Sequence, residues 1–324
     1  MSGKMIGIEL GADALKLAVV RKGKILKMAA ETIPAHLISD GRVAAPEVLS
    51  QFLKGSLKKN RICGRKCALV LPSQLVVSQR LMLPHMTEAE LKLNLPYEFR
   101  DYIGSHTNDY TFDYIVTDLR DGMMDLYAVA VRKQDMEDYY QVFRGAGLTL
   151  RLAMPAEMAW LNVVRDANRT SGSLCIVDVG HEKTCINIYR NNRFVMGKYI
   201  DLGGNVFDEI LAGEQGVDTY TARSRKETNV PESESLRKAY DAVATEILKT
   251  LTFYSYAEAG ERVRELYLCG GSANVDQLRR AIGKATDLEP CHISGLLSVA
   301  DDQAAEALRC GLAAGAAMQH TKEA

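Results

Sequence analysis

A strand–turn–strand unit occurs twice in this sequence, and the repeat limits the folds that the chain can adopt. The later copy runs from Cys175 to Gly204. It begins with an apolar run in which Asp178 and Gly180 end a buried strand, and an alternating strand returns after a tight turn. An Asp beside a Gly turn suits a phosphate or Mg²⁺ site, because glycine lets backbone N–H groups approach an anion and the carboxylate holds a metal or its water. Taken alone, the pattern is also that of a plain hairpin.

The earlier copy runs from Ile6 to Leu26, near the start of the chain. With Glu9 laid on Asp178 the copies align without a gap, and the matched pairs are Gly11 with Gly180, Asp13 with Glu182, Leu17 with Ile186, and Arg21 with Arg190. Self-similarity on this scale predicts two related α/β domains that face each other, with a ligand between the two acidic turns.

Composition places the chain among ordinary globular proteins. Its 324 residues are 47% hydrophobic and 25% charged, which predicts two or three domains. The net charge of −1 gives no overall field that would favour nucleic acid or anionic lipid, and the basic loop Lys58–Lys66 is interpreted as a solvated surface. Seven scattered cysteines indicate buried thiols in a reducing compartment, and no second Cys or His pair completes a zinc site with Cys63 and Cys67.

Neither a secretory signal nor an apolar run of membrane length is found in the sequence, so we expect a cytoplasmic protein.

The segment between the two copies has a different pattern, which predicts a strand, a helix, two strands and a second helix in that order. Thr87-Glu-Ala-Glu90 has the spacing of a capping box and opens a helix through Ile103, in which Pro96 predicts a kink or a break. Asp121-Gly122 joins the two strands as a hairpin, and Gln134–Ala146 forms the closing helix. We expect a compact inserted domain of the usual small size.

A third glycine-rich turn follows late in the chain. The strand Val263–Leu268 runs into Cys269-Gly270-Gly271-Ser272, and a helix comes next. Strand, Gly-Gly turn and helix suit a nucleotide contact, because backbone without side chains lets a ring or a phosphate pack closely. A simple tight turn is the alternative.

These three motifs together resemble the nucleotide-binding elements of the actin, Hsp70 and sugar-kinase superfamily. The insert narrows the resemblance to the family of the type IV pilus assembly protein PilM, with cell-division FtsA as a more distant relative. The stretches that carry it are Leu83–Leu91, Tyr97-Glu98, Tyr102-Ile103, Asp113-Tyr114, Ala146–Leu148 and the helix Glu157–Leu161.

The resemblance implies an α/β, actin-like fold of duplicated domains with central mixed sheets and a small α+β subdomain inserted in the first domain. The implied boundaries are 1–73, 149–172 and 304–324 for the first domain, 74–148 for the insert and 173–303 for the second domain.

The resemblance also implies ATP with Mg²⁺ in the cleft. Asp178 and Glu9 would hold the metal, and Glu157 would orient the attacking water, although a helix-surface carboxylate is the simpler interpretation of Glu157. The residues placed around the nucleotide are Gly11, Ala12, Asp13, Lys16, Gly180, His181, Glu182, Lys183, Gly203, Gly204, Lys226, Gly270, Gly271 and Ser272.

Several of these positions depart from the family's pattern. Glu9 replaces an Asp, and Asp13 would oppose a triphosphate unless a metal bridged them or Lys16 offset its charge. The family's Ala-Glu-x-x-Lys adenosine contact appears as Ala222–Lys226, with Arg223 in place of the Glu. We therefore expect ATP hydrolysis to be weak or absent.

The family further implies a scaffold that grips the N-terminal cytoplasmic peptide of a bitopic inner-membrane partner, PilN, near the junction of the insert and the first domain. It would be peripheral at the inner face of the cytoplasmic membrane, reach the bilayer only through its partner and self-associate. An ATP-dependent small-molecule kinase on the same superfold is the alternative. A division-type membrane tether is disfavoured, because Gln319–Ala324 offers no amphipathic helix.

Overall fold

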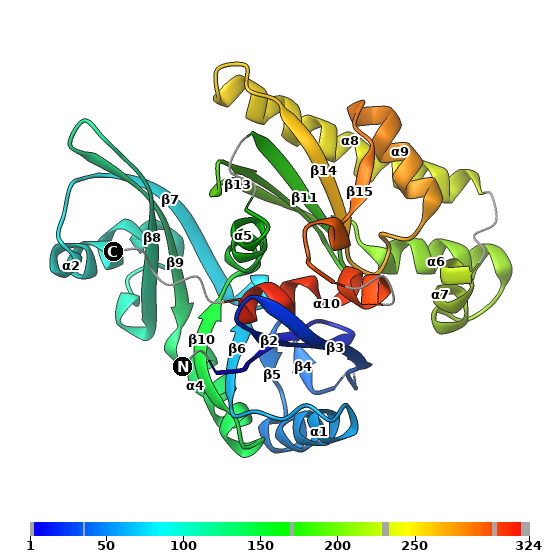
Figure 1. Ribbon diagram of the computed structural model, residues 1–324, viewed down its shortest axis with the longest axis horizontal. Helices are drawn as coiled ribbons and strands as arrows, with labels where there is room; N and C mark the ends of the chain where they lie inside the picture. The colour runs from blue at the N-terminus through cyan, green and yellow to red at the C-terminus, as the bar shows by residue number, and fades with distance from the viewer. Residues whose placement is uncertain (1–2, 35, 169–171, 229–232, 300–302, 319–324) are drawn as a thin grey trace.

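The computed structural model describes residues 3–34, 36–168, 172–228, 233–299 and 303–318, with the backbone alone for residues 226–228. Figure 1 shows three parts: the first domain at the bottom, the insert at the left and the second domain at the upper right. Each large domain is built on a five-stranded sheet, and the insert on a three-stranded one.

The sheet of the first domain has the strand order β10-β6-β1-β2-β3. Its strands are β1 (Met5–Leu10), β2 (Ala14–Arg21), β3 (Lys24–Thr32), β6 (Lys66–Val70) and β10 (Thr149–Met154), with a small ribbon of β4 (Ile38–Ser39) and β5 (Arg42–Val43) beside them. β1 pairs antiparallel with β2 and parallel with β6. The carboxyl ends of β1 and β6 therefore lie at one edge of the sheet.

Helices cover both faces of this sheet, because its strands are apolar on both sides. Ile6 and Ile8 face the core formed with α1 (Pro46–Lys59) and α4 (Lys133–Gly145). Ala18 and Val20 face the opposite core, which contains α5 (Ala156–Asp166) and α10 (Ala304–Ala317).

The second domain repeats this plan. Its sheet has the order β13-β12-β11-β14-β15. The strands are β11 (Ser173–Val179), β12 (Thr184–Arg190), β13 (Arg193–Ile200), β14 (Val263–Cys269) and β15 (Pro290–His292). The helices are α6 (Gly204–Gln215), α7 (Thr219–Thr228), α8 (Glu234–Ala257) and α9 (Asp276–Thr286), and a 3₁₀ turn covers Ile293–Gly295.

Backbone irregularities recur at equivalent places in the two sheets. The β2–β3 ladder shifts register between Val19 and Val20, and the β12–β13 ladder shifts between Ile188 and Tyr189, the aligned pair. Both hairpins then turn through two residues of positive φ, which are Lys22 with Gly23 and Asn191 with Asn192. The predicted duplication is confirmed.

The insert forms a small α+β unit. Its sheet, β7-β9-β8, consists of β7 (Val76–Pro84), β8 (Tyr110–Arg120) and β9 (Met123–Arg132). The helices are α2 (Glu88–Glu98) and α3 (Arg100–Ile103), and 3₁₀ turns cover Ser73–Leu75 and Thr107–Asp109. Thr87 and Glu90 form the expected capping box, and Pro96 lies in the last turn of α2, after which Phe99 ends the helix.

Helix α4 belongs to the first domain by packing, although the sequence placed it within the insert. Its buried side chains Tyr139, Val142 and Phe143 join the core that holds Leu49 and Leu53 of α1. The insert's own clusters draw on α2, the β-sheet and flanking residues. The independent packing unit of the insert thus ends before α4, because the apolar stripe of this helix faces α1.

Helix α10 packs closely across the first sheet and against α5. A Cβ on Gly315 would lie 2.2 Å from the carbonyl oxygen of Ala159, and one on Gly311 would lie 2.4 Å from the Trp160 ring. Both positions therefore need glycine for close approach. Among the described helices, none combines the length and apolarity needed to span a bilayer.

Candidate functional site

The turn between β1 and β2 carries an ion pair at its base. Glu9 and Lys16 are partners across the ladder, and the Lys16 Nζ lies 2.5 Å from Glu9 Oε1. The second carboxylate oxygen of Glu9 is buried and finds no hydrogen-bond partner among the described residues. Burial alone would lower the pKa of Lys16, but the charges of Glu9 and Asp178 raise it well above its ordinary value. Lys16 is therefore a fixed cation.

The turn between β11 and β12 has the same backbone construction. Gly180 N–H donates to the carbonyl of Lys183 at 3.0 Å, as Gly11 N–H donates to that of Ala14 at 2.9 Å. Asp178 occupies the place of Glu9. Burial raises the pKa of Asp178 to about 6 against the pull of Lys16, with Glu9 adding to the rise.

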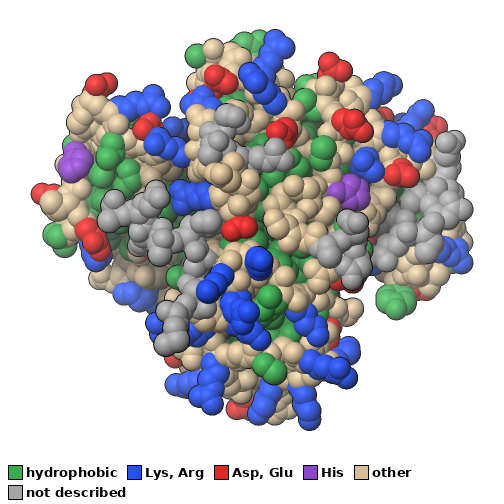
Figure 2. Space-filling model, in the orientation of Figure 1, with side chains coloured by type: hydrophobic (Ala, Val, Ile, Leu, Met, Phe, Trp, Pro, Cys, Tyr) green, Lys and Arg blue, Asp and Glu red, His purple; other side chains and the backbone are tan. Residues whose placement is uncertain are grey.

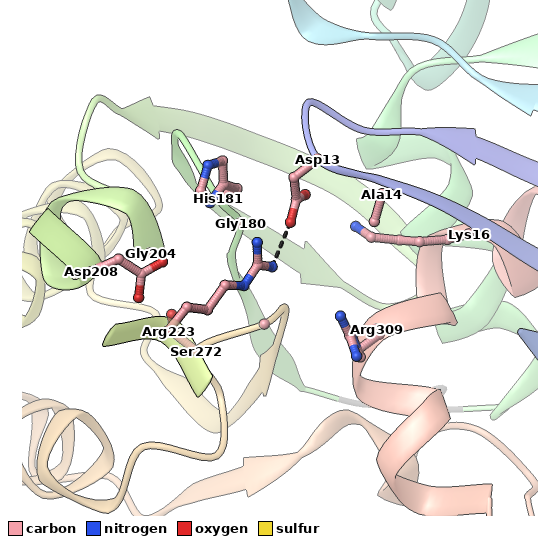
Figure 3. A pocket seen from close by; sticks show the side chains of 11 residues that line it. Asp13, Ala14, Lys16, Gly180, His181, Gly204, Asp208, Arg223, Ser272 and Arg309 are labelled. Carbon is pink, nitrogen blue, oxygen red and sulfur yellow. Dashed lines mark hydrogen bonds and ion pairs between the residues drawn. The ribbon is translucent and has the colours of Figure 1, made fainter. Parts of the chain in front are cut away.

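The two turns face each other across one cleft, and Figure 3 shows their side chains converging. Residues from both domains line it, namely Asp13, Ala14, Lys16, Gly180, His181, Gly204, Asp208, Arg223, Gly271, Ser272 and Arg309. The cleft therefore unites residues of both predicted turns and of the late Gly-Gly turn. Arg309, which reaches in from α10, and Asp208 of α6 were missed, because nothing local in the sequence marks them.

A salt bridge closes the middle of this cleft. The Arg223 guanidinium reaches across from α7 to the Asp13 carboxylate (Figure 3). Although burial alone would raise it, the pKa of Asp13 is lowered by Arg223. The remaining cavity is small, with a volume of about 30 Å³. The departure from the family pattern at Arg223 thus has a structural counterpart that we did not predict.

The glycines of the later motifs serve close backbone packing on the second turn. Gly270 has a φ of +90°, and a Cβ there would lie 2.3 Å from the carbonyl oxygen of Val179. A Cβ on Gly203 would lie 2.3 Å from that of His181, and Gly204 N–H donates to Gly180 at 2.8 Å. Gly271 is exposed, with nothing near its Cβ position.

The remaining predicted contacts are dispersed. Ala12 and Glu182 are exposed, and Lys183 lies 3.4 Å from Asp201. Lys226 lies in α7, and its side chain is outside the described part of the structure.

Glu157 requires a correction. It is only 5% exposed, so it is not a helix-surface carboxylate. It lies in a second cavity of about 290 Å³ between the insert, α5 and β12–β13, rather than in the lining of the cleft. Tyr127 of the insert donates to its Oε1, Tyr199 of β13 to its Oε2 at 3.4 Å, and burial raises its pKa. This arrangement gives no support to the water-orienting role.

The cleft does not fit Mg²⁺-ATP as it stands. The described residues contain no group of three or more His, Cys, Asp or Glu that could hold a metal. The two acidic side chains predicted to do so face the Lys16 ammonium, and the Arg223–Asp13 bridge spans the cleft from α7 to the first turn. We therefore derive no nucleotide chemistry from this arrangement.

Duplicated sheets, two facing acidic turns and a late Gly-Gly turn define the class: this is a protein with an actin-like fold. The family model "Type IV pilus assembly protein PilM" matches residues 7–308. The chain belongs to this family, which makes it a type IV pilus assembly protein, and the resemblance drawn from the sequence is confirmed.

Solved structures agree on the fold. A PilM-PilN type IV pilus biogenesis complex matches with a TM-score of 0.85 at 21% identity, over 98% of each chain. The ethanolamine utilization protein EutJ from Carboxydothermus hydrogenoformans matches at 0.61 and 16%, over 97% of this chain and 90% of that one. MreB5 of Spiroplasma citri bound to AMPPNP matches at 0.53 and 13%, over 92% and 93%.

Proposed function

We propose that this chain is a scaffold of a type IV pilus assembly machine, and that it binds the N-terminal cytoplasmic peptide of a bitopic, PilN-like inner-membrane protein. Membership of the PilM family supports a role in this machine, and the similarity to a structure described as a PilM-PilN complex supports a PilN-like partner. The protein would then be peripheral at the inner face of the membrane.

The observation that carries the proposal is an available strand edge at the junction of insert and first domain. β10 is an edge strand of its sheet and pairs with β6 on one side. It directly follows α4, and Leu152 is 39% exposed beside a register shift. An exposed strand edge with an apolar side chain suits the addition of an extended peptide.

Calorimetry with a synthetic N-terminal peptide of a bitopic protein encoded beside this chain tests the proposal. We expect binding by the wild type and at least a tenfold loss in Leu152→Glu, because the change places a charge on the apolar contact. Leu26→Glu is the matched control, since Leu26 is 42% exposed on β3 at the opposite edge of the same sheet. Equal losses in both variants, or no binding by the wild type, would remove the proposal.

The proposed function does not depend on ATP and Mg²⁺. The small volume of the cleft and its Arg223–Asp13 bridge support weak or absent hydrolysis. Peptide binding should therefore proceed equally well without nucleotide, which the same calorimetry measures with and without Mg²⁺-ATP. A kinase function finds no supporting observation in the described residues.

A further inference from the structure

Charge is unevenly divided along this nearly neutral chain. Residues 1–73 contain 13 Lys and Arg against five Asp and Glu, whereas the whole chain has a net charge of −1. Interactions between exposed charges are screened beyond about 8 Å at physiological salt. What a partner meets at close range is therefore the charge of a face and not the sum over the molecule.

The few carboxylates of this segment are largely turned away or already engaged. Glu9 and Asp13 lie in the cleft with Lys16 and Arg223. Glu31 accepts a hydrogen bond from Ser56 and lies 3.3 Å from Lys59. The two that remain exposed, Asp40 and Glu47, lie before α1 and in its first turn.

Apart from Arg42, which lies 3.3 Å from Asp135 in an ion pair, we call the exposed cations of this segment the basic surface. It consists of Lys4, Arg21, Lys22, Lys24, Lys54, Lys58, Lys59, Arg61, Arg65 and Lys66. In the described part of the chain, Lys59 is the member that lies within ion-pair distance of a carboxylate. The other members have no counterion there, so their charge is presented to solvent.

Strand register places much of the basic surface at the end of the first domain away from the cleft. Lys4 precedes β1, whose far end carries Glu9, and Ile6 is paired with Cys67 just after Lys66. The β2–β3 turn, with Arg21 and Lys24, lies at the same end, because Met5 pairs with Val20. Figure 2 shows Lys and Arg gathered over the first domain with few Asp or Glu among them.

The chemistry of this surface favours lipid headgroups over nucleic acid. Seven of its ten cations are lysines, which act as point charges, while arginine forks are preferred for reading phosphates and bases. Residues 1–73 contain one aromatic residue, the half-buried Phe52, so they offer no platform on which bases could stack. Each Lys or Arg held near an anionic bilayer adds to the attraction.

The position of the surface agrees with that choice. Thr149, at the start of β10, donates its N–H to the carbonyl of Arg65 at 2.6 Å. The basic surface thus adjoins the strand edge proposed for the partner's peptide, and this one step rests on the proposed function. A peptide that leads directly into a bilayer would bring this end of the domain close to the headgroups.

We propose that the basic surface binds anionic phospholipid headgroups and holds the first domain against the membrane by its own charges. The contact is electrostatic and non-specific, and it needs neither the partner peptide nor nucleotide. It goes beyond attachment through a partner alone.

Co-sedimentation of the full chain with vesicles tests this proposal. Vesicles of equal parts phosphatidylglycerol and phosphatidylcholine should bind the chain at low salt, and vesicles of pure phosphatidylcholine should not. The variant Lys24→Glu, Lys54→Glu, Lys58→Glu, Lys66→Glu should lose roughly a hundredfold or more in partitioning, since each charge near an anionic surface contributes about fivefold. Raising the salt should release the wild type.

The matched control makes the same change in net charge on the second domain, through Arg262→Glu, Arg264→Glu, Arg280→Glu and Lys284→Glu, all at exposed positions. It should retain vesicle binding, and circular dichroism should show both variants folded. Equal loss in the two variants would mean that only net charge matters and would overturn the proposal. So would a wild type that ignores anionic vesicles, or one that prefers a DNA duplex to them. The peptide calorimetry described above uses no vesicles, so its outcome tests the proposed function independently of this proposal.

Discussion

Lys16 is the residue on which the electrostatics of the cleft depend. Its ammonium lies 2.5 Å from Glu9 and its charge also acts on Asp178, so one cation faces two carboxylates. Neutralising both acids with one ammonium is incomplete in a buried site. Burial raises the pKa of Asp178 to about 6, because Lys16 offsets only part of that effect and the charge of Glu9 adds to it.

Replacing Asp178 should therefore stabilise the chain at neutral pH. The pKa of this carboxyl is 3.8 when unperturbed and about 6 when folded, so its stabilising contribution is complete below about pH 4 and is lost as the pH rises through 6. The loss is up to about 3 kcal/mol. Thermal unfolding of wild type and Asp178→Asn between pH 4 and 8 should show a gain for the variant that grows over this window. A variant that is less stable at pH 7 would show instead that Lys16 holds Asp178 ionised.

Asp13 should be the residue that keeps triphosphates out. Asp13→Ser removes an anion from the cleft and leaves the Arg223 guanidinium facing it, so Mg²⁺-ATP should bind better. The shift of the unfolding midpoint by millimolar Mg²⁺-ATP should be larger in Asp13→Ser than in the wild type. Glu47→Ser, which removes an exposed carboxylate far along the chain, is the control. An unchanged shift in Asp13→Ser would assign the exclusion to another feature of the cleft.

Individual residues could be predicted from the sequence only where the backbone requires a particular residue type. Gly180, Gly203 and Gly270 stand where a turn or a close approach excludes a side chain, so their spacing is visible in the chain. The partner of Asp13 was not visible, since Arg223 lies on a helix in the other domain and meets it only after folding. Glu157 was misread for the same reason, because its burial is supplied by tyrosines of two other segments.

Among the elements, α10 shows how the packing of a helix can depend on glycines, which carry no side chain. Its glycines bring it onto α5, where Gly311 meets the Trp160 ring and Gly315 meets the backbone of Ala159. Mid-helix glycine ordinarily costs about 1 kcal/mol relative to alanine. Here the close contact reverses that preference.

Gly311→Ala should consequently destabilise the chain by about 1–3 kcal/mol, because the added methyl group overpacks against Trp160. Gly55→Ala is the control within α1, where no atom lies within 4 Å of the new Cβ. That variant should gain about 0.5–1 kcal/mol. Urea unfolding of the two variants measures both signs, and a stabilised Gly311→Ala would show that α10 can shift away from α5.

Most element boundaries could be predicted from the sequence, because the residues that begin or end an element lie next to it in the chain. The capping box at Thr87 and the hairpin at Asp121-Gly122 both form as the sequence indicated. The domain against which α4 packs could not be predicted, because the apolar stripe of the helix indicates that it is buried but not which neighbour covers it. Because α4 lies between the insert strands and β10 in the chain, its position suggested packing within the insert, which was wrong.

For the whole molecule, Glu157 is the point where the three parts meet. Its side chain accepts from Tyr127 of the insert, and its backbone carbonyl accepts from Tyr189 of the second domain at 2.8 Å. Arg193 and Asp118 add an ion pair of 3.0 Å between the second domain and the insert. Polar contacts around a cavity thus help to position the insert, together with the packing of the Tyr127 ring on Phe194.

Tyr127→Phe should loosen the insert, because it leaves a buried carboxylate short of one donor at a cost of about 1–3 kcal/mol. Hydrogen exchange should increase in β7, β8 and β9, with smaller changes in the two large sheets. Tyr110→Phe serves as the comparison, since it removes a hydroxyl from the insert strand β8 outside the lining of that cavity. Uniform exchange throughout the Tyr127→Phe protein would show that this contact does not position the insert.

The recurrence of one register shift and one two-residue turn in both halves has a consequence for how such proteins diverge. The bends lie in the main chain of each sheet, at Val19–Val20 and Ile188–Tyr189, away from the acidic turns that line the cleft. The acidic turns have exchanged their side chains while the curvature of the strands stayed the same. Descendants of such a duplication can lose or replace their chemistry and still keep their architecture intact.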